Sequence, residues 1–473
     1  MRKNRVWFGF IAFILIMSLI AGCAGGNSGT NTPAPGSNNG STGSANQDNN
    51  TEDPKPKDPV TIKLHTHGTE ANYNWAHTIA EFEKAFPDIK VELEVLSEKG
   101  DSHEALQKLD LLASSGETLD VLMFSDPASY AMRVGLGMVA PLNEFIERDG
   151  YNVEEEYKVN TIMNGQYYAL PGKFNPWYVL LNKNHLAEAN LPVPTDWTWD
   201  DFADYAKQLT TGEGTSKRYG TYFHGPQNGG WMEFLKLALA SQAENTEFVK
   251  EDGTSNLDDP MFQRTLELRY QMEKTDQSST PYSDMLSQKL HYRPQFFNQA
   301  ASMILIGSWM NTELGGTEQF PLEFEVAVAP YPKNSASDAG GYTPVTTDFM
   351  AVAAKSKQKE EAYTFIRWYT TEGQIVQGKN IPSWNKVSDD DLVQIVDTIL
   401  SGTLTPEKVD KESLIQTLRN SKSSKMIPPV TFQSEIYQAL NEEYEKMILG
   451  SQSLDKTLEA MKERTQKIID TNK

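Results

Sequence analysis

The stretch VTIKLHTHGTEANYNWAHTIAEFEKAFPDIKVELEVL, residues 60–96, decides the fold class of this chain. Its two ends, 60–65 and 89–96, alternate apolar and polar residues as half-buried strands do. Between them, residues 75–86 place apolar side chains on one face of a helix, and Pro87 ends that helix. A strand, a helix and a second strand predict a parallel pair joined by a right-handed crossover.

The alternation of strands and helices continues further along the chain. Residues 104–113 have a helical spacing of apolar side chains, and residues 120–124 form a short apolar strand. Open α/β sheets bind ligands beyond the carboxyl ends of their strands. We therefore predict an α/β fold with ligand contacts in the loops at 67–73 and 125–126.

Other segments have strong local signals. In DWTWDDFADYAKQLT, residues 196–210, Thr198 stands three residues before Asp201, close to a capping box at the start of an amphipathic helix. The stretch 324–332 has the composition of a strand, and 453–473 spaces its apolar residues as a helix does. The folded part is about 415 residues long. A single hydrophobic core usually stabilises a shorter chain, so two lobes are expected.

The N-terminus has the layout of a secretory signal. A basic start is followed by an apolar run at 6–20 and by the small residues Ala21 and Gly22. The run is shorter than the roughly 20 residues of a membrane-spanning helix. Cys23, the only cysteine in 473 residues, has no partner for an intramolecular disulfide. There are two alternatives: Cys23 has a specific role, or the segment is an ordinary signal peptide with an incidental cysteine.

Residues 24–58 have the composition of a flexible tether. They contain no aromatic residue and no aliphatic residue larger than alanine, so they cannot bury enough apolar surface to fold. A tether of this length reaches about 30 to 35 Å. The formal net charge of the chain is −21, which argues against nucleic acid or an anionic lipid surface as a partner.

Five segments resemble, in the same order, elements of the extracellular solute-binding proteins of ABC sugar importers, the large family that includes maltose-binding protein. They are 60–96, SSGETLDVLMFSD (114–126), the segment 164–210, FFNQAASMILIGSW (296–309) and AAKSKQKEEAYTFIRWYTTEGQ (353–374). The third segment, which begins NGQYYALPGKFNPWYVLLNK, is the most specific match. Two departures occur: Asn190 stands where the family often has glycine, and Asn298-Gln299 replace a usual basic residue.

This resemblance implies a two-lobed periplasmic-binding-protein-like fold, with hinge-connected lobes that close on a ligand in the cleft between them. In addition, LIAGC at 19–23 resembles the lipobox of bacterial lipoproteins, in which Cys23 becomes the first mature residue and carries the lipid. The implied domains are a lipoprotein signal peptide (1–22), a lipidated Cys23 with its tether (23–58), an N-terminal lobe (59–172 plus 330–380) and a C-terminal lobe (173–329 plus 381–473).

The implied function is that of a receptor. It would bind a carbohydrate on the extracellular face of the cytoplasmic membrane, anchored by lipid at Cys23, and deliver it to the permease subunits of an ABC transporter. We expect a monomer without cofactor, metal or catalytic residues. Several available aromatic side chains favour a di- or oligosaccharide over a monosaccharide. Ala24 is compatible with a cell envelope of one membrane or of two.

Sugars present apolar C–H faces and hydroxyl groups, so their sites combine flat aromatic rings with polar side chains. Three tryptophans, Trp197, Trp199 and Trp368, are expected to be structural. The candidate aromatic and loop residues are Trp231, Trp309, Trp177, Trp384, Trp75, Tyr73, Tyr342 and Gly341, and the candidate polar residues are Asp126, Asn175 and Glu70. For the tryptophans the alternative is a place in the core, and for Asp126 it is a cap on the following helix.

Two other functions remain open from the residues alone. Carboxylate pairs and tryptophans also suit a secreted glycoside hydrolase, although 64 acidic residues make such pairs uninformative. His65 and His67, on one face of the first strand, could serve a metal-binding receptor, together with His77 and His103. No acidic or thiol partner stands at a fixed ligand spacing from them.

Overall fold

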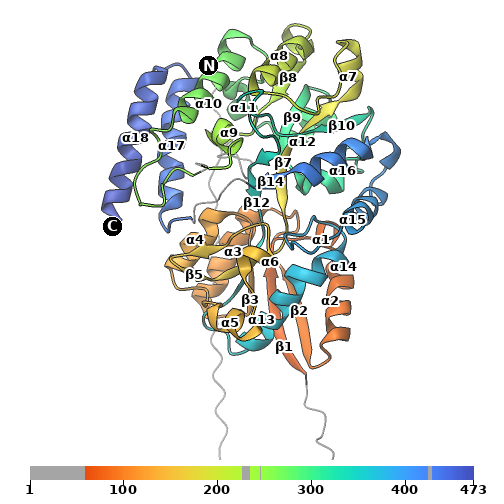
Figure 1. Cartoon of the computed structure of the whole chain (residues 1–473), viewed down its shortest axis with the longest axis vertical. Coiled ribbons are helices and arrows are strands. Elements are labelled where there is room, and N and C mark those ends of the chain that lie inside the picture. Colours follow the sequence, from red (N-terminus) through yellow and green to blue (C-terminus); the bar gives the residue numbers. More distant parts are fainter. Residues whose placement is uncertain (1–58, 226–234, 245–246, 424–428, 473) are drawn as a thin grey trace, which may run out of the picture. The chain divides into compact units, whose positions relative to one another are not determined.

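A computed structural model describes residues 59–225, 235–244, 247–423 and 429–472. The fold described below is that of the compact unit Lys57–Lys473. Its main elements are two sheets covered by helices (Figure 1).

The first sheet has the strand order β2-β1-β3-β13-β6. Its strands are β1 (Val60–Thr66), β2 (Ile89–Val95), β3 (Val121–Phe124), β6 (Ala169–Pro171) and β13 (Phe349–Val352). β1 runs parallel to β2 and β3, which confirms the parallel sheet predicted from the first part of the chain. β13 runs antiparallel to both β3 and β6.

Helices follow the parallel strands. α2 (Trp75–Ala85) and α3 (Ser102–Ser115) confirm the two predicted helices, α4 (Pro127–Gly135) follows β3, and α13 (Lys359–Trp368) follows β13. Neighbouring residues of β3 belong to different hydrophobic clusters, Val121 to one and Leu122 to the other. Because successive side chains of a strand point to opposite faces, both faces of this sheet are buried.

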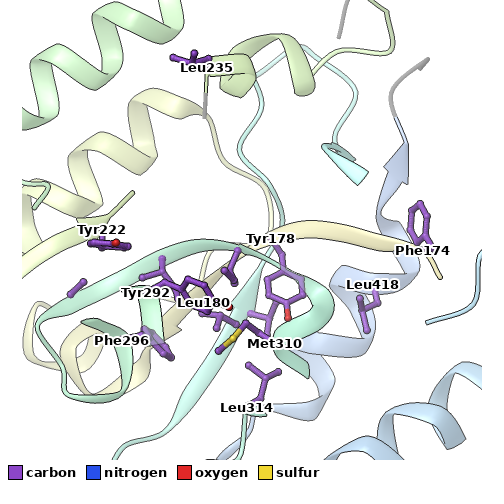
Figure 2. Packing of buried hydrophobic residues seen from close by; sticks show 14 of the residues in the cluster. Phe174, Tyr178, Leu180, Tyr222, Leu235, Tyr292, Phe296, Met310, Leu314 and Leu418 are labelled. Atoms are coloured by element: carbon purple, nitrogen blue, oxygen red, sulfur yellow. The ribbon is translucent and has the colours of Figure 1, made fainter. Parts of the chain in front are cut away.

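The second sheet has the strand order β10-β7-β9-β8. Its strands are β7 (Asn175–Asn182), β8 (Tyr219–Tyr222), β9 (Ala301–Gly307) and β10 (Val326–Ala329). β7 is antiparallel to β9 and β10, and β8 is parallel to β9. Figure 2 shows part of the largest core, in which Tyr178 and Leu180 of β7 lie near Met310 and Leu314.

Two local predictions for the second half are confirmed. Thr198 and Asp201 form a complete capping box at the start of α8 (Trp199–Leu209). The last helix, α18 (Leu454–Thr471), packs beside α17 (Gln433–Ile448). Among the described residues, every helix is too short or too polar to cross a lipid bilayer.

The remaining helices and short strands fill in the connections. The helices are α1 (Glu70–Tyr73), α5 (Asn143–Asp149), α6 (Val153–Glu156), α7 (Lys183–Glu188), α9 (Leu237–Ala240), α10 (Pro260–Tyr270), α11 (Tyr282–Gln288), α12 (Tyr292–Phe297), α14 (Gln374–Gln377), α15 (Asp389–Ser401) and α16 (Lys411–Asn420). The strands are β4 (Ile162–Met163), β5 (Gln166–Tyr167), β11 (Tyr342–Thr343), β12 (Val345–Thr346) and β14 (Lys422–Ser423).

Three backbone segments lie side by side where the chain passes between the sheets. The first connects β6 to β7, the second connects β12 to β13, and the third follows α14. Gly172 N donates to Asp348 O at 2.9 Å, and Phe174 N donates to Ile381 O at 2.7 Å, which joins the first segment to each of the others. The lobe boundaries given above stay predictions.

Candidate ligand-binding site

One edge of the first sheet brings together loops from four strands. In the register of this sheet, Phe349 at the start of β13 pairs with Phe124 and with Pro171, the last residues of β3 and β6. The residues just beyond these strand ends are therefore neighbours of Asp348, which precedes β13. His67 joins them because it directly follows β1, the parallel neighbour of β3.

Four polar side chains at this edge form a connected group, here called the Tyr73 cluster: His67, Tyr73, Lys173 and Asp348. Tyr73 Oη donates to Asp348 Oδ2 at 2.9 Å. Lys173 Nζ donates to Tyr73 Oη at 2.6 Å and lies 3.1 Å from Asp348 Oδ2. His67 Nε2 lies 3.3 Å from Tyr73 Oη. Asp348 is 1% exposed, and its Oδ1 has no hydrogen-bond partner in the described part of the chain.

The charges of the Tyr73 cluster balance. Lys173 and Asp348 form an ion pair shielded from solvent. Burial lowers the pKa of His67 to about 4, so its ring is neutral at neutral pH. Burial and the Asp348 carboxylate raise the pKa of Tyr73, which keeps the phenol protonated. The cluster is thus one cation, one anion and two neutral rings.

Trp75, another candidate residue, packs against this cluster, whereas Glu70 does not contact it. Trp75 is fully buried and stacks between Tyr73 and Tyr369, with ring centroids 5.3 and 5.2 Å away. Its Nε1 donates to Gly68 O at 3.0 Å. Both faces of the indole are covered by protein rings. Glu70 is exposed, and its Oε2 accepts from the backbone N–H of Ala76 at 3.0 Å.

The second sheet places three candidates together at one edge. Trp177 near the start of β7 pairs with Gly307 at the end of β9. The Trp177 and Trp309 rings meet edge to face, 5.4 Å apart at 81°. Ser308 Oγ donates to Asn175 Oδ1 at 3.1 Å. Asn175 and Trp177 are buried, and Trp309 is half-buried.

A glycine is required beneath Trp309. A Cβ atom on Gly307 would lie 1.9 Å from the Trp309 ring, so only glycine lets the ring lie over the backbone there. Next to this pair, His224 follows β8, with its ring 5.7 Å from Trp177 and stacked 4.7 Å from Tyr292. Trp231 lies outside the described residues.

Asp126 and Trp384, two further candidates, form hydrogen bonds within the protein. Asp126 caps α4: its Oδ1 accepts from Ser129 N at 2.8 Å and its Oδ2 accepts from Ser129 Oγ at 2.5 Å. Both carboxylate oxygens are thus engaged by the cap. Trp384 Nε1 donates to Glu156 Oε1 at 2.8 Å, and its ring packs against the core of the first sheet.

Gly341, which directly precedes Tyr342, lines a different cavity. Gly341 has a φ of +92°, and the cavity, of about 460 Å3, is also bordered by the segment 193–197 and α16. A Cβ at Gly341 would lie 2.2 Å from Asn420 O. Lys422 Nζ lies 5.6 Å from the centre of the Tyr342 ring. The structure does not bring these two residues into the Tyr73 cluster.

Sequence reasoning missed several residues of the two sheet edges, namely Lys173, Asp348, Ser308 and His224. It placed His67 in a predicted ligand-contact loop, but it gave that residue a specific role only as a metal ligand. Among the described residues, no group of three His, Cys, Asp or Glu side chains could hold a metal ion. Asp348 was missed because it precedes an antiparallel strand, whereas the strand-end rule points to residues that follow parallel strands. Lys173 stands two residues after the end of β6, and this position was the available signal.

Comparison with known proteins shows the family and the fold of the chain. Residues 66–375 match the family model described as bacterial extracellular solute-binding protein. The chain belongs to this family. Such proteins bind solutes and are not enzymes, so the glycoside-hydrolase alternative is wrong. The expected relationship to sugar-binding proteins of the maltose-binding type is confirmed.

Solved structures of this family share the fold. A sugar transporter from Rhizobium etli, in an open conformation, is 22% identical with a TM-score of 0.67, over 86% of this chain and 99% of that chain. An ABC substrate-binding protein from Listeria monocytogenes in complex with cycloalternan is 21% identical, with a TM-score of 0.67, over 88% and 99%. UgpB from Mycobacterium tuberculosis in complex with glycerophosphocholine is 17% identical, with a TM-score of 0.67, over 88% and 99%. The predicted two-lobed α/β fold is confirmed.

Proposed function

We propose that this solute-binding protein is the carbohydrate receptor of an ABC importer. The observation that carries the proposal is the pair of Trp177 and Trp309 beside Asn175, at the edge of the second sheet. Trp309 is half-buried, and its ring is held by Trp177 and by the backbone of Gly307. A fixed, partly open aromatic ring provides the apolar platform on which a sugar face stacks.

Asn175 supplies a polar group next to this platform. Its Oδ1 accepts from Ser308, which orients the amide, and its Nδ2 has no hydrogen-bond partner among the residues described. An oriented amide N–H group can donate to a sugar hydroxyl. A half-open ring and an oriented amide together satisfy the two requirements of carbohydrate binding, and Trp231 remains a proposed second platform.

A carbohydrate fits these residues better than a phosphate ester such as the glycerophosphocholine bound by the Mycobacterium protein. Cationic donors favour the binding of a phosphate group, and Lys173, at the edge of the first sheet, is already neutralised by Asp348. Neutral hydroxyl groups need no such charge. The number of aromatic side chains favours a di- or oligosaccharide.

The anchor belongs to the same proposal and rests on sequence, because Cys23 and its tether lie outside the described residues. A lipid on Cys23 would hold the receptor at the extracellular face of the membrane, beside the permease that takes up the solute. Labelling of living cells with a palmitate analogue should mark the wild-type protein. Cys23→Ala should lose the label and appear in the medium; a variant that stays labelled would contradict the anchor.

Calorimetry and thermal shift with the purified protein test the binding proposal. The panel is maltose, maltotriose, cycloalternan, α-D-tagatose and glycerophosphocholine. We expect a saccharide to stabilise the protein by about 2.7 kcal/mol at a hundredfold excess over its Kd. Trp309→Ala and Trp231→Ala should each remove most of this shift, whereas Trp368→Ala should lower the melting temperature without removing it. Binding of glycerophosphocholine alone would contradict the proposal.

A further inference from the structure

His67 is the first residue after β1, where ligands bind in open α/β sheets. Its side chain is 11% exposed, so part of the ring reaches the surface. The ring stands edge-on to Tyr73, 5.8 Å away at 84°. A histidine in this place can contact a solute, and the state of its two ring nitrogens decides what it can recognise.

The hydrogen bonds of Tyr73 determine that state. Tyr73 has one hydroxyl proton, and the Asp348 carboxylate can only accept, so that proton lies in the bond to Asp348 Oδ2. Lys173 Nζ can only donate, so it donates to the Tyr73 oxygen. His67 Nε2 can then bond to Tyr73 Oη only by donating its own proton. The neutral ring therefore carries its proton on Nε2 and a free lone pair on Nδ1.

The surroundings of His67 keep that lone pair available. Asp348 and Asp101 raise its pKa and Lys173 lowers it, but burial is the largest effect and brings the pKa to about 4. Nδ1 has no partner in the described ranges, and it is not fully buried. An acceptor nitrogen at a strand end is thus open to a donor from outside the protein.

We propose that the Tyr73 cluster fixes His67 in its Nε2–H tautomer, so that Nδ1 accepts a hydrogen bond from a hydroxyl group of the bound solute. This inference rests on the proposed function and adds a recognition rule to it. Ionised carboxylate and phosphate groups cannot donate to Nδ1, so at this position His67 favours a hydroxyl group of the solute over a carboxylate or phosphate group. Tyr73, Lys173 and Asp348 are positioning residues.

Nitrogen NMR of the histidine rings tests the tautomer without any ligand. The chain has seven histidines, and comparison with His67→Gln assigns the signal of His67. In the purified protein at pH 7, we expect protonated Nε2 and unprotonated Nδ1. An Nδ1–H tautomer or a charged ring would overturn the proposal.

Asp348→Asn tests the positioning. An Asn amide can donate to Tyr73 Oη, which frees the tyrosine proton to turn toward His67, so the preference for Nε2–H should weaken. Glu443→Gln is the matched control, because Glu443 is a comparably buried carboxylate, ion-paired with Lys446 on α17. It should lower stability and leave the His67 signals unchanged. An unchanged tautomer in Asp348→Asn would contradict the positioning role.

The solute contact is tested with each saccharide of the panel that binds in calorimetry. We expect the Nδ1 signal to shift on binding and His67→Ala to weaken binding by roughly 5- to 20-fold. An unchanged Nδ1 signal and an affinity within twofold of wild type would overturn the inference and leave the proposed function standing. If no saccharide binds, the proposed function fails, and the solute contact fails with it.

Discussion

At the residue scale, Gly307 determines whether the aromatic platform can exist. Gly307→Ala would place a Cβ where the Trp309 ring now lies, 1.9 Å from its nearest atom. The backbone φ of −86° suits alanine, so the strain falls on the half-buried ring and not on the strand. We expect saccharide affinity to fall by at least tenfold, with a loss of stability of about 1 to 2 kcal/mol.

Gly402→Ala is the control for this change. Gly402 follows α15, and its added Cβ would meet the flexible end of Lys379. Calorimetry on both variants measures affinity, and denaturant unfolding measures stability. Equal saccharide affinity in Gly307→Ala and in the wild type would mean that Trp309 is not the platform.

His185 gives the fold a dependence on pH that is separate from the site. The side chain is 3% exposed, and burial, followed by the charge of Arg218, lowers its pKa to about 4. An unfolded chain takes up the proton near pH 6.5. The contribution of neutral, buried His185 to the free energy of unfolding is therefore complete above pH 6.5, and it is lost as the pH falls toward 4.

We expect His185→Gln to remove part of this pH dependence. Between pH 6.5 and 4, its free energy of unfolding should fall by about 1 to 3 kcal/mol less than that of the wild type. Glutamine can still bond to Ser302, which now lies 3.0 Å from His185 Nδ1. Urea unfolding at a series of pH values provides the measurement, and parallel curves for the two proteins would refute the assignment.

At the scale of elements, Asp126 can be tested for two roles at once. Asparagine caps helices about as well as aspartate, so Asp126→Asn should keep the stability of α4 within about 0.5 kcal/mol. Asp126→Ala should cost about 1 kcal/mol. Because the cap engages both carboxylate oxygens, we expect Asp126→Asn to bind saccharide within twofold of wild type. A large loss of affinity at unchanged stability would show that the carboxylate binds the solute.

The sequence predicted those elements whose signals are local. β1, β2 and α2 appear in 60–96 because each strand alternates and the helix has its own apolar face. β9 (Ala301–Gly307) was not predicted, because all seven residues are buried and nearly all are apolar, so no alternation appears. The pairing of β13 with β3 was also not predicted, because it joins residues more than 200 positions apart.

The distinction between local signals and distant pairings also applies to the candidate site. Asn175, Trp177 and Trp309 were named because they stand in segments that resemble family motifs, and the structure places them together. The Tyr73 cluster could not be derived, since its ion pair joins Lys173 to Asp348 through the packing of two separate segments. Residues whose roles depend on such distant pairings become visible only in three dimensions.

At the scale of the whole folded unit, the three segments between the sheets are the natural place for a hinge. They are short and hydrogen-bonded to one another, so rotation there can leave both cores intact. A ligand stabilises a closed arrangement only by contacts that the open one lacks. Trp309 on the second sheet and His67 on the first are the residues expected to supply such contacts.

We therefore expect a saccharide that binds in calorimetry to reduce the radius of gyration measured by small-angle X-ray scattering. Trp309→Ala should keep the dimensions of the free protein at the same saccharide concentration, because it loses contacts on one side of the cleft. His67→Ala should show an intermediate response, since it loses one hydrogen bond and keeps the aromatic platform. Tight binding with unchanged dimensions in the wild type would mean that one lobe alone holds the solute, and hinge closure would then have no role in recognition.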